Sequence, residues 1–268
     1  MITLTKHHGL GNDFLVCDTA QVGAGAAWAS LARKWCDRRR GIGADGLLLL
    51  TIVDANELVM VLHNADGSRA EMSGNGIRCL AQAAYMAQSR DGSVEYTVHT
   101  DAGLRTVATH VVDDNTVRAS VSMGAVTHID EPTGWENIGA DPARPVLHLG
   151  VGNPHAVVGV DDVGVVDLVA LGTKIPQVNL EIIEPGPEQH SITMRVHERG
   201  AGITEACGTG ACASAWAAAH WGLVTPSNGE ILVHMDGGDA TVRLNDPEQG
   251  HVTLVGPAVF VARVHVEL

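Results

Sequence analysis

The sequence predicts an α/β protein made of two related halves, and three observations lead to this prediction. Short runs of β-branched and aliphatic residues recur along the chain, with Gly, Asp, Asn and Pro between them. Helical patterns also occur, but they are fewer. Two glycine-rich segments, one in each half of the chain, resemble each other and each leads into a helical pattern.

The apolar runs are the predicted strands. Several of them alternate apolar and polar residues with period two, which is typical of a half-buried strand. The clearest runs are residues 58–62, 94–98, 116–121, 156–160 and 191–196. The Pro- and Gly-rich segment 184–188 predicts a surface turn.

Three segments have helical patterns, namely residues 28–36, 77–88 and 211–221. In the second, one face collects the apolar residues Ile77, Leu80, Ala81, Ala84 and Tyr85. The third is so rich in alanine that we expect it to pack tightly inside a sheet. We therefore expect the second and third helices to be central in their respective halves.

The two glycine-rich segments are residues 72–79 and 206–212. Each has a small nucleophilic side chain, Ser73 or Cys207, then Gly-x-Gly, then a helix with a second cysteine in it. This repetition favours two related units that face each other.

Composition and charge are those of a soluble globular protein. Of 268 residues, 45% are hydrophobic and 18% charged, and the low aromatic content of 3% means that aliphatic residues must build the core. The net charge of -14 argues against nucleic acid or an anionic membrane as a partner. The longest apolar run, near residues 47–50, is too short to span a bilayer.

The chain also has features that favour the cytoplasm. Its first residues lack a basic segment followed by an apolar stretch, so we expect no secretory signal. The five cysteines are an odd number without metal-ligand spacing, and we expect reduced thiols that mostly fill the core. Cys207 is the exception.

Cys207 stands at the expected start of a helix, where unpaired N–H groups and the helix dipole create a positive field. Such a site binds carboxylates, and it lowers the pKa of a cysteine so that a thiolate could act as a base. A buried structural cysteine is the alternative interpretation.

Neither glycine-rich segment is a Walker or Rossmann loop, so a nucleotide site is disfavoured. The histidines lack metal-ligand spacing, so a metal site is disfavoured too.

Polar residues in turn-like segments are further candidates. Asn12, Asn64, Asn153 and Asn179 each lie in such a segment, where asparagine usually serves the local backbone. Arg199, beside Glu198 in a glycine-rich turn, could hold a substrate carboxylate with two hydrogen bonds. A surface ion pair is the alternative.

Taken together, these segments resemble the diaminopimelate epimerases. The matching strings occur in the family's order and extend from residue 8 to about residue 257. They are His8-Gly9-Leu10-Gly11-Asn12-Asp13-Phe14, Gly43-Ala44-Asp45-Gly46, Asn64-Ala65-Asp66-Gly67-Ser68, Gly74-Asn75-Gly76-Ile77-Arg78-Cys79, Gly152-Asn153-Pro154-His155, Glu198-Arg199-Gly200-Ala201-Gly202 and Ala206-Cys207-Gly208-Thr209-Gly210.

The resemblance implies an α/β fold of two similar domains, each with mixed sheets wrapped around a central helix, and an active site in the interdomain cleft. We place the N-terminal domain at residues 1–118 and the C-terminal domain at residues 119–256. The C-terminal strand, residues 257–268, is expected to return to the first domain.

The resemblance also implies the reaction, which interconverts LL- and meso-2,6-diaminopimelate on the path to lysine and peptidoglycan. Two cysteines exchange protons at the α-carbon, with no pyridoxal phosphate, other cofactor or metal. Cys207 matches one of them, and His155 and Glu198 match the groups that tune their pKa values. The substrate-binding positions are matched by Asn12, Asn64, Gly74, Asn75, Asn153, Asn179, Glu198, Arg199, Gly208 and Thr209. A cytoplasmic homodimer is implied as well.

Ser73 departs from the family pattern, because the second catalytic cysteine is expected there. A serine hydroxyl is much less acidic than a thiol, so Ser73 could donate a proton more readily than remove one. Three alternatives follow: an engineered change, an active natural variant, or altered chemistry such as that of a hydroxyproline epimerase or a dehydratase. A protein that only binds an amino acid is a further alternative. Gly46 is a lesser departure, since some members carry a polar residue there.

Overall fold

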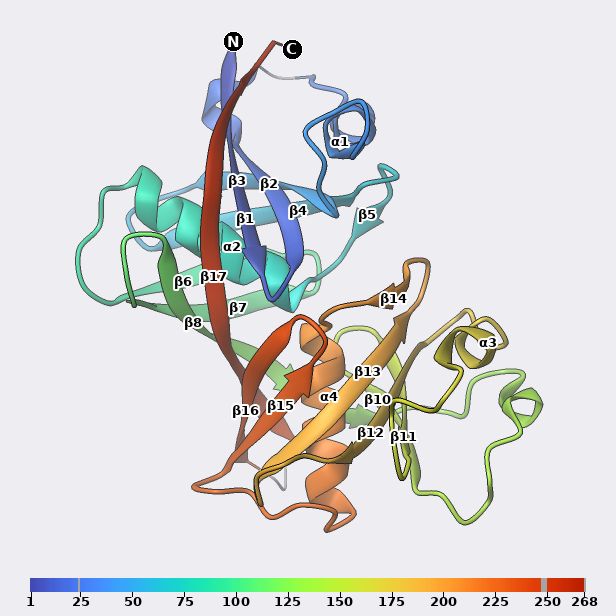
Figure 1. Ribbon diagram of the computed structural model, residues 1–268. Coiled ribbons are helices and arrows are strands. Elements are labelled where there is room, and N and C mark those ends of the chain that lie inside the picture. The colour runs from blue at the N-terminus through green and yellow to red at the C-terminus, as the bar shows by residue number, and fades with distance from the viewer. Residues whose placement is uncertain (24, 247–249, 268) are drawn as a thin grey trace. The chain divides into compact units, whose positions relative to one another are not determined.

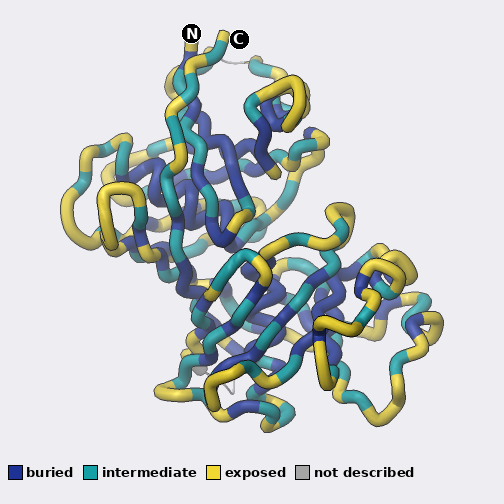
Figure 2. The backbone as a smooth tube through the Cα atoms, viewed as in Figure 1, coloured by how far each residue is buried: buried dark blue, intermediate teal, exposed yellow. Residues whose placement is uncertain are grey.

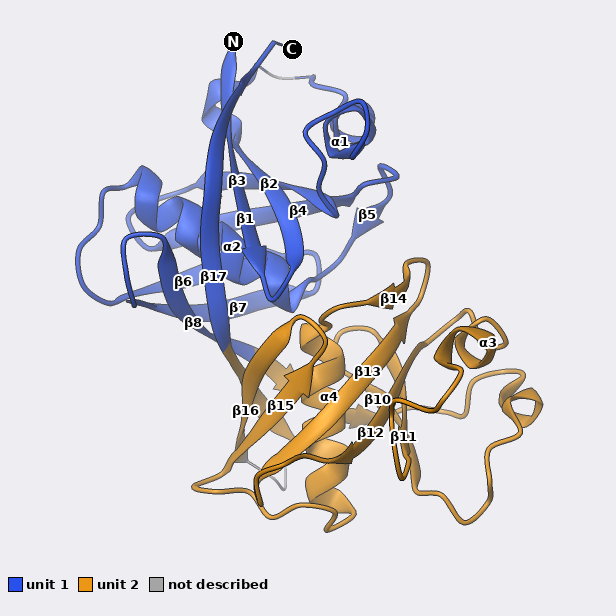
Figure 3. Ribbon diagram, viewed as in Figure 1, with its two compact units in different colours: residues 1–122, 256–268 blue, residues 123–255 orange. Residues whose placement is uncertain are grey.

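The computed structural model describes residues 1–23, 25–246 and 250–267, and the chain divides into two compact units (Figures 1 and 3). Unit 1 consists of residues 1–122 and 256–268, and unit 2 of residues 123–255. The sequence placed the boundaries near residues 118 and 256. Both divisions fall within strands, β8 (Thr116–Ala125) and β17 (His251–Val266), so each of these strands contributes to both units.

Besides its parts of β8 and β17, unit 1 contains seven strands and two α-helices in the described residues. In chain order they are β1 (Ile2–Gly9), β2 (Asn12–Asp18), α1 (Trp28–Cys36), β3 (Gly46–Ile52), β4 (Glu57–Asn64), β5 (Arg69–Ala70), α2 (Gly74–Ala87), β6 (Val94–Thr100) and β7 (Gly103–Val111). A 3-10 turn, η1 (Thr19–Gln21), follows β2.

Unit 2 repeats this order in its own described residues. After β9 (Thr127–His128) and the 3-10 turn η2 (Trp135–Ile138) come β10 (Val146–Gly150), β11 (Pro154–Gly159), α3 (Leu168–Gly172), β12 (Asn179–Pro185), β13 (Ser191–Glu198), β14 (Gly202–Thr204), α4 (Gly208–His220), β15 (Glu230–Met235) and β16 (Gly238–Asp246).

The strand pairings repeat as well. In unit 1, β2 pairs in parallel with β3, β3 antiparallel with β4, and β4 in parallel with β6. In unit 2, β11, β12, β13 and β15 pair in the same way. The predicted fold class, α/β with two similar units and mixed sheets, is therefore confirmed.

Each unit holds one buried helix. In α2 every residue from Gly74 to Tyr85 is buried, and α4 is buried along nearly all its length (Figure 2). Helix α2 contacts β1–β4 and β7, whereas α4 contacts β10–β13, β15 and β16. The many alanines and glycines of α4 have little side-chain bulk, which lets strands approach the helix closely. Both helices are thus central, as predicted.

The shorter helices cover the other side of the strands. Helix α1 packs through Trp35 on a cluster that includes Leu47 and Leu49 of β3, whereas Leu48, between them, lies against α2. This division follows from the alternation of side chains along a strand. Helix α3 packs on β11 and β12 in the corresponding way. Within the described residues, no helix is long and apolar enough to cross a membrane.

The local predictions agree with the structure in most respects. All five predicted strands and all three helices are present, and the helix at 28–36 has those bounds. Helices α2 and α4 begin three residues earlier than their apolar patterns, because the glycine-rich segments form their first turns. Helix α3 was not predicted, since five residues are too few for a periodic pattern. The turn at 184–188 begins later than predicted, because β12 continues to Pro185.

Candidate active site

The two helix starts have the same local geometry. Ser73 caps α2, its Oγ accepting a hydrogen bond from Gly76 N at 3.0 Å, and Cys207 caps α4, its Sγ accepting one from Gly210 N at 3.4 Å. Both caps have extended backbones, as helix N-caps usually do. The glycines make room for these side chains. A Cβ added to Gly76 would lie 3.2 Å from Ser73 Oγ, and one added to Gly210 would lie 3.2 Å from Cys207 Sγ.

In unit 1, a chain of hydrogen bonds leads from the start of α2 to the start of β2. Asn75 Nδ2 donates to Asn12 Oδ1 at 3.2 Å, and Asn12 Nδ2 donates to Asp45 Oδ2 at 2.8 Å. The guanidinium of the buried Arg78 donates to Asn75 Oδ1 at 2.7 Å. These contacts fix the orientation of both asparagine amides. The Arg78 guanidinium can only donate, so it faces Asn75 Oδ1, and the Asp45 carboxylate can only accept, so it faces Asn12 Nδ2.

The other residues of this half-site are more exposed. Asn64 is the last residue of β4, and its Nδ2 donates to Ser68 Oγ at 3.0 Å. Ser73 is partly exposed. Among the described residues no titratable side chain hydrogen-bonds to its hydroxyl, so unit 1 by itself gives Ser73 no general base.

Unit 2 has a buried, titratable cluster. His155 and Glu181 are fully buried on the adjacent strands β11 and β12, with His155 Nδ1 2.7 Å from Glu181 Oε1. His155 Nε2 lies 2.8 Å from Asn153 Oδ1. Glu198, at the end of β13, accepts a hydrogen bond from Thr204 Oγ1 at 2.5 Å and another from Cys207. The cluster thus surrounds the start of α4.

The environment of Cys207 overturns the expectation of a lowered pKa. Burial raises the pKa of the Cys207 thiol, and the neighbouring carboxylates Glu198 and Glu181 raise it further. The hydrogen bonds from Gly210 N and with Thr209 Oγ1, at 3.4 Å, act in the opposite direction but are weaker. Burial also raises the pKa of the Glu198 carboxyl. The position of Cys207 at a helix start predicted a thiolate, but the desolvation of the buried thiol outweighs the effect of the helix start.

The other four cysteines behave as core residues, as predicted. Cys17, Cys36, Cys79 and Cys212 are all buried. Burial raises the pKa of each of the first three to about 12.

Two further predicted residues, Asn179 and Arg199, also lie in unit 2. Asn179 is not in a turn, as the sequence suggested, but is the buried first residue of β12, where its Oδ1 accepts a hydrogen bond from Arg199 N at 2.8 Å. Its neighbours in the chain are apolar, so the pairing with β11 draws it into the sheet. Arg199 is exposed and makes no ion pair in the described part of the chain, so the surface ion pair with Glu198 is absent.

Matching registers relate the two half-sites position by position. On the parallel strands β2 and β3, Phe14 pairs with Gly46, and on β11 and β12, His155 pairs with Asn179. Two residues further along each strand, the pair Val16 and Leu48 therefore corresponds to the pair Val157 and Glu181. Leu47↔His63 corresponds to Leu180↔His197, which places Asn64 and Glu198 at equivalent strand ends. The equivalent pairs are Asn12 and Asn153, Phe14 and His155, Gly46 and Asn179, Leu48 and Glu181, Asn64 and Glu198, Ser73 and Cys207, and Asn75 and Thr209.

Sequence reasoning missed Glu181, Asp45 and Arg78. Glu181 carries a visible signal, since it is the only charged residue in the otherwise apolar segment from Leu180 to Ile183. Asp45 and Arg78 lie within the matching strings, but nothing in the sequence indicates that they hold asparagines. Among the described residues, no group of three or more His, Cys, Asp or Glu side chains is arranged to hold a metal ion.

Comparison with known proteins identifies relatives of this chain. Over the full chain, the protein is 37% identical to a diaminopimelate epimerase of Phocaeicola vulgatus, covering 99% of that protein. It is 36% identical to one of Thermosynechococcus vestitus, with 97% of each chain covered.

A solved structure shares the fold. A phenazine biosynthesis protein of the PhzF family from Bacillus anthracis superposes with a TM-score of 0.77 at 15% identity, covering 100% of this chain and 99% of the other. The diaminopimelate epimerase family model matches residues 4–129 and 148–261. The chain therefore belongs to the diaminopimelate epimerase family.

Proposed function

We propose that this protein is an isomerase that inverts the α-carbon of diaminopimelate, interconverting the LL and meso forms on the path to lysine and peptidoglycan. The observation that carries the proposal is the pair of matching helix starts, each with a proton-bearing side chain at its cap. An α-proton is very weakly acidic, so the carboxylate must accept negative charge in the transition state. A helix N-terminus can supply that stabilisation without a cofactor or metal, and the family resemblance implies that both helix starts take part.

In this proposal Gly74, Asn75, Gly208 and Thr209 receive the reacting carboxylate. Each of the four lies in the first turn of α2 or α4 and is buried. Asn12, Asn64, Asn153 and Asn179 hold the polar groups of the substrate, together with Glu198. Arg199 binds the distal carboxylate, for which its exposed guanidinium is unpaired in the described structure.

The proton chemistry starts at Cys207. Its thiol hydrogen-bonds to Glu198, whose pKa is raised by burial, so this carboxylate can accept the thiol proton. The arriving α-ammonium of the substrate adds a positive charge, which favours the thiolate. The thiolate then removes the α-proton, and the hydroxyl of Ser73 delivers a proton to the opposite face of the carbanion. Glu198 then releases the proton it took from the thiol to solvent, and solvent returns one proton to the serine alkoxide, so the enzyme regains its starting protonation.

The Ser73 hydroxyl favours a second candidate, a related epimerase acting on a hydroxyproline. A single thiol opposite a hydroxyl is an arrangement that the resemblance associates with such enzymes. Assays with diaminopimelate and with hydroxyprolines, run in parallel, distinguish the two.

We also propose, from the family resemblance, that the protein works in the cytoplasm as a homodimer. Light scattering would then give twice the chain mass of 28.0 kDa.

The experiment that tests the function follows diaminopimelate by NMR in D₂O, which measures loss of the α-proton signal and inversion together. We expect exchange from the diastereomer whose α-proton faces Cys207, and net inversion slower than exchange, because the serine step is the slow one. A protein that binds diaminopimelate but exchanges no proton would contradict catalysis and support the binding-only alternative.

A further inference from the structure

The two half-sites differ in one respect that their common topology does not require. Behind the helix start, unit 1 has the apolar side chains Phe14 and Leu48, whereas unit 2 has His155 and Glu181 at the equivalent positions. The equivalence extends to packing. An added Cβ at Gly76 would meet Leu48 Cδ2 at 3.4 Å, and one at Gly210 would meet Glu181 Oε1 at 2.6 Å. The common topology thus accommodates a leucine at this position in unit 1, so it does not by itself require a glutamate in unit 2.

Burial of the Glu181 carboxylate is unfavourable in free energy. It is fully buried, and its Oε2 has no hydrogen-bond partner among the described residues. A buried ion pair is often no more stable than apolar residues of the same volume. A contribution to the stability of the folded protein therefore does not explain why a glutamate is buried here, and the contacts of Glu181 indicate another role.

The contact with Glu181 orients the His155 ring. An ionised carboxylate only accepts hydrogen bonds, so Nδ1 of His155 must carry a proton in order to donate to Glu181 Oε1 at 2.7 Å. The ring is then fixed with Nε2 directed at Asn153, 2.8 Å away. The same Glu181 oxygen lies beside the first turn of α4, where its negative charge acts on Cys207.

We propose that Glu181 is a positioning residue that fixes the orientation of His155 and keeps Cys207 a neutral thiol until substrate binds. This inference rests on the proposed function, because it assigns Glu181 a part in the same proton transfer. Cys207 then ionises only when the ammonium group of the substrate compensates the negative charge of the thiolate.

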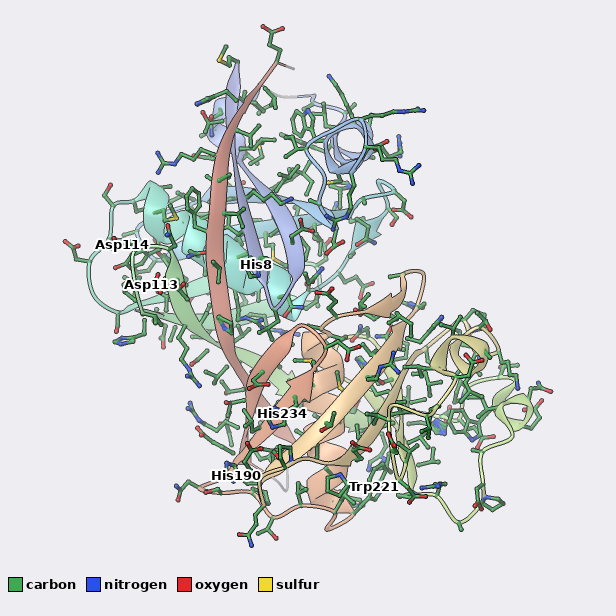
Figure 4. All side chains as sticks on the ribbon, in the orientation of Figure 1. His8, Asp113, Asp114, His190, Trp221 and His234 are labelled. Atoms are coloured by element: carbon green, nitrogen blue, oxygen red, sulfur yellow. The ribbon has the colours of Figure 1, made fainter. Side chains whose placement is uncertain are left out.

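The charges around Cys207 agree with this assignment. Glu198 on β13 and Glu181 on β12 both raise the pKa of the Cys207 thiol, after burial itself, and the His155 ring on β11 lies next to Glu181. Titratable groups on other strands that pack against α4 are engaged elsewhere. His148 of β10 lies edge-on to Trp135, and His234 of β15, labelled in Figure 4, pairs with Glu188 and Asp239.

Two variants test the proposal. Glu181→Gln keeps the shape of the side chain and removes the charge, and Glu181→Leu installs the residue of the equivalent position in unit 1. Glu95→Gln, at an exposed site on β6, is the matched control. The readouts are the pH dependence of Cys207 alkylation by iodoacetamide, mapped by mass spectrometry, and kcat and KM for diaminopimelate as functions of pH.

We expect the midpoint of Cys207 alkylation to move to lower pH in both Glu181 variants, because a negative charge near the thiol has been removed. We also expect kcat to fall at least about tenfold with little change in KM, because an unfixed His155 ring slows proton removal at Cys207 until this step, and not the Ser73 step, limits the rate. The control should match the parent in all three quantities. An unchanged alkylation midpoint in either variant, or an unchanged kcat, overturns the proposal.

The alkylation measurement needs no substrate, so it separates the two hypotheses. A parent protein that neither exchanges nor inverts diaminopimelate would refute the proposed function, while the alkylation midpoints would still decide whether Glu181 controls Cys207. Unchanged midpoints together with an active parent would refute only the role of Glu181.

Discussion

At the scale of single residues, the site depends on whether each proton-bearing group is buried. Cys207 and Ser73 cap their helices in the same way, yet Cys207 is buried beside two carboxylates and Ser73 is partly exposed with no titratable partner among the described residues. The same local geometry therefore supports two different acid–base roles. The direction of the pKa shift at Cys207 is set by desolvation and not by the helix start.

Ser73 gives the first residue-scale prediction. In one direction of the proposed reaction Ser73 has to act as a base, and the pKa of a serine hydroxyl is poorly matched to neutral pH. Ser73→Cys should therefore raise the rate of inversion at least about tenfold, which corresponds to about 1.4 kcal/mol of barrier. NMR of diaminopimelate in D₂O measures this rate. If the variant inverts at the parent's rate or more slowly, Ser73 is an adapted residue and the account of an impaired base is wrong.

His7 gives a second prediction, about stability. It is fully buried on β1, its Nδ1 bonded to Gln82 Oε1 at 2.8 Å, and burial lowers its pKa from 6.5 to about 4. The unfolded chain therefore binds a proton more readily than the folded protein. The stability that His7 contributes is complete above pH 6.5 and is lost as the pH falls towards 4, by about 3 kcal/mol at most.

Urea unfolding between pH 7 and pH 4 measures this slope. The variant His7→Gln should show a shallower decrease, because its side chain does not titrate. His251→Gln, at an exposed position of β17, controls for the loss of a histidine as such. Equal slopes in the parent and in His7→Gln would show that His7 does not cause the decrease.

At the scale of elements, the glycine of each first helical turn determines how closely the capping side chain and the sheet approach. Gly210 has almost no free space, since an added Cβ would lie 2.6 Å from Glu181 Oε1, whereas at Gly76 the nearest contact would be 3.1 Å. This difference arises because Glu181 extends to the helix and Leu48 stops short of it. The second glycine of Gly-Thr-Gly is therefore a packing requirement as well as a feature of the helix start.

Gly210→Ala should accordingly destabilise the protein by about 2 kcal/mol, because overpacking of a buried site outweighs the helix propensity of alanine. Gly76→Ala should cost less, since its neighbours need to move only slightly. Gly23→Ala, where an added Cβ meets nothing within 4 Å, is the control. Urea unfolding measures all three, and a Gly210→Ala variant as stable as the control would show that the strand and the helix start separate easily.

At the scale of the whole molecule, unit 1 is discontinuous in sequence. Residues 256–268 belong to it, and β17 pairs antiparallel with β1 from Ile2↔Val266 to His8↔Val259. The carbonyl of Pro257 also accepts a hydrogen bond from Arg78 Nε at 3.1 Å, which ties the end of the chain to the start of α2. The last strand therefore supports the Ser73 half-site.

A chain that ends at residue 255 should lose this support. We expect the amides of β1 to lose their protection from hydrogen exchange, because β17 is one of the two strands to which β1 is paired. The amides of β12, which lies between β11 and β13 in unit 2, should keep theirs. Hydrogen-exchange mass spectrometry makes the comparison. Equal protection of β1 in both chains would mean that the pairing with β2 suffices.

The sequence by itself determined most of the elements of this protein and indicated candidate site residues. Strands such as β4 and β13 follow from local alternation, and the starts of α2 and α4 follow from Ser73, Cys207 and the glycines after them. These features depend on neighbours in the chain, which the sequence displays. The family resemblance added roles for residues such as Arg199, whose local context alone left two interpretations open.

Only the tertiary structure decided how those residues act on each other. Glu181 meets His155 and Cys207 because the registers of β11 and β12 bring together three positions that are far apart in the chain. No periodic pattern encodes such a meeting. The same packing reversed the predicted pKa shift of Cys207, because the free energy of a buried charge depends on everything within a few ångströms of it and not on the chain next to it.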